Sequence, residues 1–247
     1  MLPLGDSIPT RQPAITTWLL IGANAVVFFL QLTLPRESLE QVFQVFGVVP
    51  ARYVWPEQWT FATGIQALSF WPLLTSQFLH GGWFHIFANM WTLWVFGDNV
   101  EGRLGPIRFL LFYLLCGIAA GLIHILLNPN STVPAVGASG AISGVLGAYL
   151  LMFPTSRLIL MVPIFFFPFF FEMPAVTYIA AWFLMQLFSG TLSLLGPEQV
   201  GGVAWWAHIG GFLGGLVLTP IFLGGLASKQ KRFPDDGWIE HAWKRGW

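Results

Sequence analysis

The sequence has little charge and almost no cysteine. Only 9% of its 247 residues are charged and 55% are hydrophobic, whereas soluble domains carry roughly 25% charged residues. The formal net charge is zero, which gives no support for an anionic partner such as nucleic acid, and we expect none. The single cysteine, Cys116, excludes an internal disulfide and gives no metal-ligand spacing. These scarcities indicate one integral membrane domain with several spans.

Long apolar runs separated by polar segments predict an all-α bundle of six membrane-spanning helices. The expected spans are residues 15–34, 80–96, 107–127, 139–153, 174–195 and 205–225. Thr16 or Thr17 is expected to cap the first of them. The fourth is short, because the sixteen residues 139–154 rise only ~24 Å, less than a ~30 Å hydrocarbon core. The loop before it should therefore dip into the membrane.

Two connections are expected to lie in or near the membrane surface. The first outer loop, 35–75, mixes aromatic residues with a few charges, which favours a partly embedded segment. Residues 158–171 are fourteen apolar residues interrupted by Pro163 and Pro168. This run is too short for a span and disfavours a straight helix, so we expect an interfacial or re-entrant connection. A polar turn is expected at 98–105, after the second span.

Basic residues indicate the orientation. With six spans and the N-terminus inside, nine of the eleven Lys and Arg residues fall on the inner side, as the positive-inside rule requires. These nine are Arg11, Arg103, Arg108, Arg157, Lys229, Lys231, Arg232, Lys244 and Arg245. We therefore expect a multi-pass protein of the plasma (inner) membrane. Its membrane domain, 15–226, should lie between a cytoplasmic N-terminal segment, 1–14, and a cytoplasmic tail, 227–247.

A glycine-rich turn, 137–140, leads directly into the fourth expected span. A serine at the start of a helix has an approachable Oγ and unpaired backbone N–H groups beside it, which suits a nucleophile and a developing oxyanion. Ser139 has this position. The structural alternative is a packing face, because Gly140 and Gly144 have the spacing of a helix-contact motif.

Few polar side chains fall inside the expected spans, and they fall at one depth. His85 and Asn89 lie one turn apart on the second span, and His208 stands near the start of the sixth. The even-numbered spans run in the same direction, so these groups share a layer with Ser139 near the outer face. Counting 158–171 as a span would move His208 to the opposite leaflet and would also break the charge asymmetry.

These residue types suit acyl transfer. Neutral His208 would take the Oγ proton as Ser139 attacks a carbonyl, and would return it to the leaving amine. The oxyanion would be held by the Ser139 N–H with His85 and Asn89. No intramembrane carboxylate is available to orient His208, so we expect a dyad oriented by packing. The structural alternative for His85 and Asn89 is a helix–helix hydrogen bond.

The chain resembles the rhomboid family of intramembrane serine proteases over about residues 16–226. The matching motifs are His80-x4-His85-x3-Asn89, Glu101-Gly-Arg103-Leu-Gly105, Gly137-Ala-Ser139-Gly140 and Ala207-His208-x2-Gly211-x3-Gly215. The resemblance implies a Ser139–His208 dyad, an oxyanion site at His85 and Asn89, no cofactor or metal, and transmembrane protein substrates cut near the outer face. The structural support is expected from Gly137, Gly140, Gly211 and Gly215, and from Glu101 with Arg103 as a pair or helix cap.

The chain departs from the family pattern at two places. The position four residues after the serine, an aromatic that packs on the histidine in well-known members, is Ser143. A Trp-Arg pair of the first outer loop has no match at its usual place. The fifth span with the loop 196–202 is the expected lateral entry, on the resemblance and the flexibility of Gly201 and Gly202.

Two other functions compete with the protease. A catalytically inactive relative that binds membrane clients should lack one of the dyad residues, and both are present. A small transporter would also place polar groups and broken helices at one depth. It should show a repeat between its halves and polar groups on both sides of the midplane, and neither is found.

Overall fold

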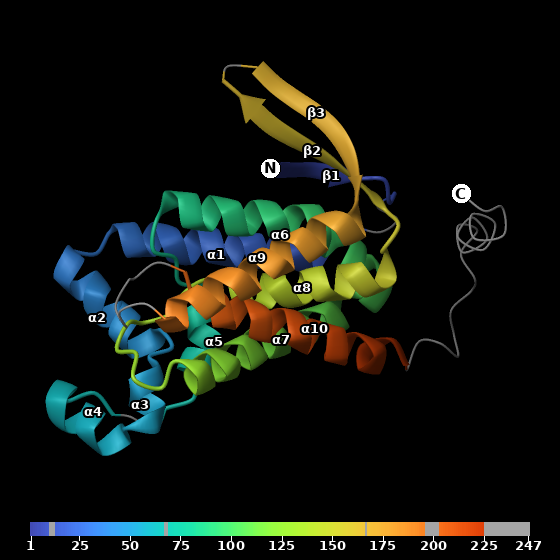
Figure 1. Ribbon diagram of the computed structural model, residues 1–247. Helices are drawn as coiled ribbons and strands as arrows, with labels where there is room; N and C mark the ends of the chain where they lie inside the picture. The colour runs from blue at the N-terminus through green and yellow to red at the C-terminus, as the bar shows by residue number, and fades with distance from the viewer. Residues whose placement is uncertain (10–12, 67–68, 166, 196–202, 225–247) are drawn as a thin grey trace.

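The body of the molecule is a bundle of six helices (Figure 1). They are α1 (Ile15–Leu32), α6 (Trp83–Leu104), α7 (Pro106–Leu127), α8 (Ser139–Met152), α9 (Ala175–Leu195) and α10 (Trp205–Gly224). The computed structural model describes residues 1–9, 13–66, 69–165, 167–195 and 203–224. The expected tail 227–247 and the expected entry loop 196–202 lie outside these residues.

Helix α8 is the centre of the bundle. All its residues from Gly140 to Tyr149 are buried, and α6, α7 and α10 pack around it. Glycines allow this packing, because a Cβ on Gly211 of α10 would overlap the Gly140 carbonyl, and one on Gly215 would overlap the Gly144 carbonyl. The two backbones are therefore in direct contact, as small residues permit in membrane helices.

Apolar length marks this chain as an integral membrane protein. Four of the described helices, α1, α7, α9 and α10, are long and apolar enough to cross a membrane. Helix α8 is apolar but shorter, with 14 residues. Short helices fill the connector before α6: α2 (Arg36–Phe46), α3 (Pro50–Val54), α4 (Pro56–Thr63), α5 (Pro72–Thr75) and the 3-10 turn η1 (Ser76–Phe78).

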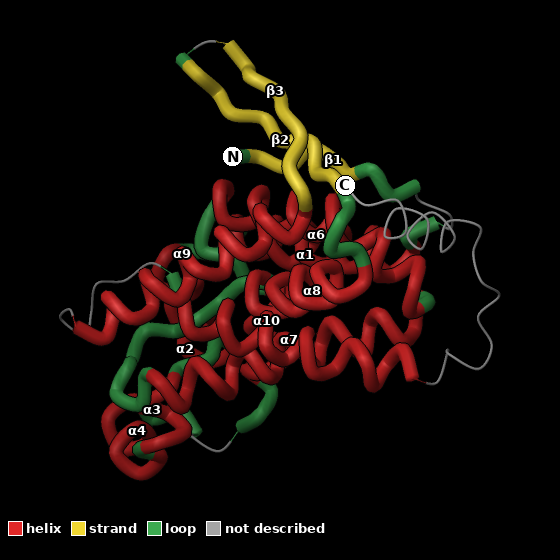
Figure 2. The backbone as a smooth tube through the Cα atoms, turned by 45° about the vertical axis from the view of Figure 1, so that its right-hand side comes forward, coloured by secondary structure: helices red, strands yellow, loops and turns green. Residues whose placement is uncertain are grey.

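A small antiparallel sheet corrects the all-α prediction. Its strands are β1 (Leu2–Asp6), β2 (Arg157–Ile164) and β3 (Phe167–Pro174), in the order β1-β2-β3. Strands β2 and β3 form a hairpin with Pro163 opposite Pro168. Residues 158–164 and 167–171 are therefore extended and not helical, since prolines and aromatic residues are compatible with edge strands. Figure 2 shows this hairpin projecting from the side of the helical bundle.

The inner end of α6 differs from the expected polar turn at 98–105. The helix continues to Leu104, and Gly105, with φ 82°, ends it. Glu101 is buried there because its carboxylate accepts the N–H groups of Thr16 and Thr17, each at 2.8 Å. The prediction that a threonine side chain caps α1 is wrong: Glu101 binds the free N–H groups of its first turn.

Candidate active site

Ser139 is the first residue of α8 and follows a constrained loop. Gly137 has φ 125°, and its N–H donates to the Ser76 carbonyl at 2.8 Å. A Cβ at Gly137 would lie 2.6 Å from Nε2 of His85. Only glycine fits this place, because both the backbone angle and the neighbouring imidazole exclude a side chain. The loop therefore sets Ser139 beside the expected oxyanion residues.

Ser139 and His208 meet across the contact between α8 and α10. The Oγ of Ser139 lies 2.8 Å from Nε2 of His208, although 69 positions separate them in the chain. His208 stands in the first turn of α10, which the glycines of that helix bring against α8. A hydroxyl and an imidazole at this distance have the geometry of an activated nucleophile and its base.

A third side chain, Gln186 of α9, completes the arrangement and was missed by the sequence analysis. Its Oε1 lies 2.8 Å from Nδ1 of His208, and the side chain is buried. An amide oxygen is an acceptor, so Nδ1 must carry the proton and Nε2 is left free to accept one from Ser139. The available signal was an amide in the middle of an apolar span, a costly placement that needs a partner.

Aromatic side chains flank the His208 imidazole. The ring of Trp182, one turn before Gln186 on α9, lies 6.1 Å from the imidazole at an interplanar angle of 35°, and Trp205 lies 6.4 Å away, edge-on. Ser143, at the position where the family has an aromatic, instead donates its hydroxyl to the Ser139 carbonyl at 2.7 Å. Helices α9 and α10 thus supply the aromatic contacts to His208.

His85 and Asn89 face the loop before Ser139 and are held by neighbours. The Gly81 N–H donates to Nδ1 of His85 at 3.4 Å, so a neutral His85 carries its proton on Nε2, the atom beside Gly137. The Nδ2 atom of Asn89 lies 3.0 Å from Nε2 of His80. Nε2 of His85 and Nδ2 of Asn89 both lie beside Gly137, next to the loop where the oxyanion is expected.

His80 is a positioning residue in this arrangement. Its backbone N–H donates to Oε1 of Gln31 at 3.0 Å, and its carbonyl accepts from Nε2 of the same side chain at 2.8 Å. His80 and Gln31 are both buried. A glutamine of α1 therefore fixes the segment before α6, which in turn fixes Asn89. Gln31 was not among the residues predicted from the sequence to support the site.

Two of the remaining predicted support residues, Glu101 and Arg103, lie in the last turn of α6. Glu101 binds the start of α1, as described above, and the guanidinium of Arg103 lies 5.3 Å from the centroid of the Phe153 ring. Gly140 and Gly211 are in contact with each other.

The family model and the similar proteins all point to one family. The family model described as Rhomboid domain matches residues 67–225. The chain is 33% identical over 141 residues to the rhomboid protease GluP of Bacillus subtilis, covering 57% of this chain and 25% of that protein. It is 36% identical over 118 residues to the putative rhomboid protease YdcA of the same organism, covering 47% and 59%. It is also 38% identical over 80 residues to the inactive RHOMBOID-like protein 8 of Arabidopsis thaliana, covering 32% and 22%. The matches thus span a quarter to about three fifths of the two bacterial relatives' own length.

Proposed function

The chain belongs to the rhomboid family, and we propose on that premise that it is an intramembrane serine endopeptidase cutting transmembrane segments of membrane-anchored proteins. The observation that carries the proposal is the 2.8 Å approach of Ser139 Oγ to His208 Nε2. It is supported by Gln186, which holds the other imidazole nitrogen at 2.8 Å. Together they form a serine–histidine–glutamine chain inside an apolar bundle.

The proposed reaction begins with proton transfer from the nucleophile. Nε2 of His208 takes the Oγ proton while Oγ bonds to the substrate carbonyl carbon, and the carbonyl oxygen becomes an oxyanion. Gln186 accepts the Nδ1–H of the imidazolium that forms. Because its amide is neutral, it orients the ring as a triad carboxylate does but gives less charge stabilisation.

Three donors are proposed to hold the oxyanion. One is the N–H of Ser139, at the start of α8, where backbone donors have no partner within the helix. The others are Nε2–H of His85 and Nδ2–H of Asn89. His208 then gives its proton to the leaving amine as the C–N bond breaks. Water next attacks the acyl-enzyme, with His208 again taking and returning the proton, and Ser139 is released.

The same proposal includes the topology. We infer that α6 and α8 cross the membrane together with α1, α7, α9 and α10, giving six spans in a domain of residues 15–226. The 14 residues of α8 rise only ~21 Å, so Ser139 would lie below the surface. The basic residues favour a plasma (inner) membrane protein with both termini cytoplasmic.

The alternative is an inactive member that binds membrane clients, because one similar plant protein is called inactive. The assembled dyad favours the enzyme. The deciding experiment is labelling of the reconstituted protein with a fluorophosphonate probe, which reacts with activated serines. We expect covalent labelling of Ser139 that is lost in His208→Ala. An unlabelled, folded wild-type protein would support the inactive alternative.

A further inference from the structure

The hairpin of β2 and β3 ends in a set of exposed apolar side chains, which we call the hairpin tip. It consists of Ile164, Phe165, Phe167, Phe169 and Phe170. Phe165 is 93% exposed and Phe167 80%. Such a cluster is costly in water and marks a contact with an apolar partner.

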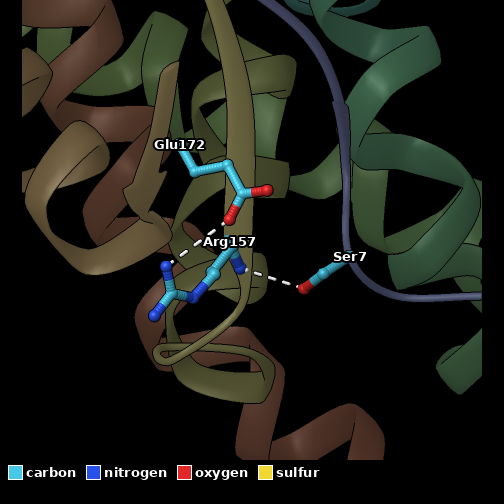
Figure 3. Close-up of polar contacts among 3 residues, drawn as sticks. All are labelled: Ser7, Arg157 and Glu172. Atoms are coloured by element: carbon cyan, nitrogen blue, oxygen red, sulfur yellow. Dashed lines mark hydrogen bonds and ion pairs between the residues drawn. The ribbon is translucent and has the colours of Figure 1, made fainter.

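Charge is confined to the other end of the hairpin. Between Arg157 and Glu172 the sequence has no charged residue. These two side chains face each other at the base, with Arg157 Nη1 at 3.4 Å from Glu172 Oε2. The Arg157 N–H also donates to Oγ of Ser7 at 3.0 Å (Figure 3). The hairpin is therefore polar where it joins the bundle and apolar at its free end.

Strand β1 shows at what level of the bundle the sheet lies. Near the end of β1, Oδ2 of Asp6 accepts from Nδ2 of Asn99 at 2.7 Å. Near its start, the Pro3 carbonyl accepts from the indole N–H of Trp91 at 2.6 Å. Asn99 and Trp91 are eight residues apart on α6, about 12 Å along the helix axis. Strand β1 therefore runs along the side of α6.

The hairpin continues this placement beside the helices. Leu2 of β1 pairs with Met161 of β2, so the middle of β2 is level with the start of β1. In Figures 1 and 2 the hairpin leaves the bundle beside the start of α9 and leans toward the side where α9 ends. Its tip consequently lies beside the bundle, in the layer that the spans occupy, and not beyond the end of the bundle.

Prolines adapt the tip to an environment without water. Pro163 and Pro168 are opposite each other in the ladder. Because neither has an N–H, they form a non-hydrogen-bonded pair, in which backbone donors would point outward. Both outer edges of the tip thus lack a donor at this position. An outward donor would be satisfied in water but not in hydrocarbon.

We propose that the hairpin tip is immersed in the hydrocarbon of the lipid bilayer, which it enters from the side where α8 ends and α9 begins. The partner of the tip is lipid, because lipid surrounds the apolar spans at the same depth at which the sheet runs along α6. The charged base at Arg157 and Glu172 stays at the polar surface, as in interfacial elements with one wet and one apolar end. The hairpin is then a membrane anchor joined to both α8 and α9. This proposal does not depend on catalytic activity.

A matched pair of spin labels on β3 tests the immersion. Phe170 and Glu172 lie two positions apart on one face of the strand, and both are exposed. Phe170→Cys and Glu172→Cys would be made in a Cys116→Ala background, labelled with a nitroxide and reconstituted into phosphatidylcholine–phosphatidylglycerol vesicles. Power saturation then compares collisions with oxygen, which partitions into lipid, and with an aqueous nickel chelate.

We expect a ratio of oxygen to nickel accessibility several-fold higher at Phe170→Cys than at Glu172→Cys. Equal ratios with free access of nickel would overturn the proposal. Protection of Phe170→Cys from both reagents would also overturn it, because another part of the chain or a second copy would then cover the tip. Phe169→Cys gives a second site on the other face of β3. Since Cys116 is fully buried, the native background serves if Cys116→Ala does not fold.

Discussion

The Nδ1 atom of His208 and the Oε1 atom of Gln186 lie 2.8 Å apart, joining α10 to α9. This contact fixes the tautomer in which Nε2 faces Ser139 without a proton. Apart from its contacts with α10, α9 has few contacts with the bundle. Displacement of α9 would remove the acceptor from His208, so the position of this helix and the readiness of the base are coupled.

Gln186→Ala should lower kcat for a reconstituted transmembrane substrate by about 10- to 100-fold, the value of one hydrogen bond to a charged group. KM should change little, because Gln186 positions His208 and does not touch the substrate. Gln186→Glu keeps an acceptor at this place and should recover most of the rate. The control is Thr191→Val on the same helix, whose hydroxyl donates to the Leu187 carbonyl within α9. Equal activity of Gln186→Ala and wild type would exclude the positioning role.

Ser139→Ala should abolish cleavage, with a loss of at least about 10³-fold, while the fold is kept. The substitution removes one oxygen from a helix start and disturbs no packing. Cleavage of a fluorescent transmembrane substrate in vesicles is the measurement, and thermal unfolding is the control. Ser143→Ala is a matched variant four residues later, since its hydroxyl donates to the Ser139 carbonyl within the same helix. It should retain activity, and persistent cleavage by Ser139→Ala would contradict the proposed nucleophile.

Gly137→Ala should strongly reduce fluorophosphonate labelling. The φ of 125° disfavours any Cβ, and that Cβ would lie 2.6 Å from His85 Nε2, so the loop must shift at a cost of about 1–3 kcal/mol. The expected result is a displaced Ser139 N–H and a weaker oxyanion site. Gly22→Ala is the control, because nothing lies within 4 Å of its added methyl group. Equal labelling of the two variants would show that the loop tolerates a side chain.

The sequence was sufficient to predict that Ser139 and His208 approach each other. Each belongs to a motif, and the glycines of α8 and α10 indicate a close contact between these two helices. Gln186 could not be found in this way. A neutral amide inside an apolar span is also typical of a helix–helix hydrogen bond, and only the packing of α9 against α10 gives it an imidazole partner. The aromatic neighbours of His208 likewise come from the tertiary arrangement.

The sheet could not be predicted from the sequence, for a different reason. An apolar run with two prolines is compatible with both a re-entrant segment and an edge hairpin, and the five-residue strand β1 gives no periodic signal. Its pairing with β2 joins positions about 155 apart in the chain. The long α6 was missed similarly, since Glu101 can be buried in a helix only because the first turn of α1 supplies its donors.

Gly211→Ala should destabilise the bundle and abolish labelling of Ser139. The added methyl group would overlap the Gly140 carbonyl, so α10 must move away from α8 and His208 must leave Ser139. Overpacking of this kind typically costs about 1–3 kcal/mol. Gly224→Ala, on the same helix but with nothing within 4 Å of the new methyl group, should behave as wild type. Thermal unfolding in detergent and probe labelling together distinguish a folded, inactive protein from an unfolded one.

Asp6 should make stability depend on pH. Its carboxylate accepts the Tyr149 hydroxyl and Nδ2 of Asn99, each at 2.7 Å, and burial raises its pKa above the ordinary value of 3.8. The folded state then binds the proton more tightly than the unfolded state. The contribution of this group to the unfolding free energy therefore falls as the pH rises from 3.8 through the raised pKa of the folded state. We expect the midpoint of thermal unfolding to decrease from pH 4 upward. Asp6→Asn keeps an acceptor and does not titrate, and should lack this slope. An identical pH profile for wild type and Asp6→Asn would show that the carboxyl is not the titrating group.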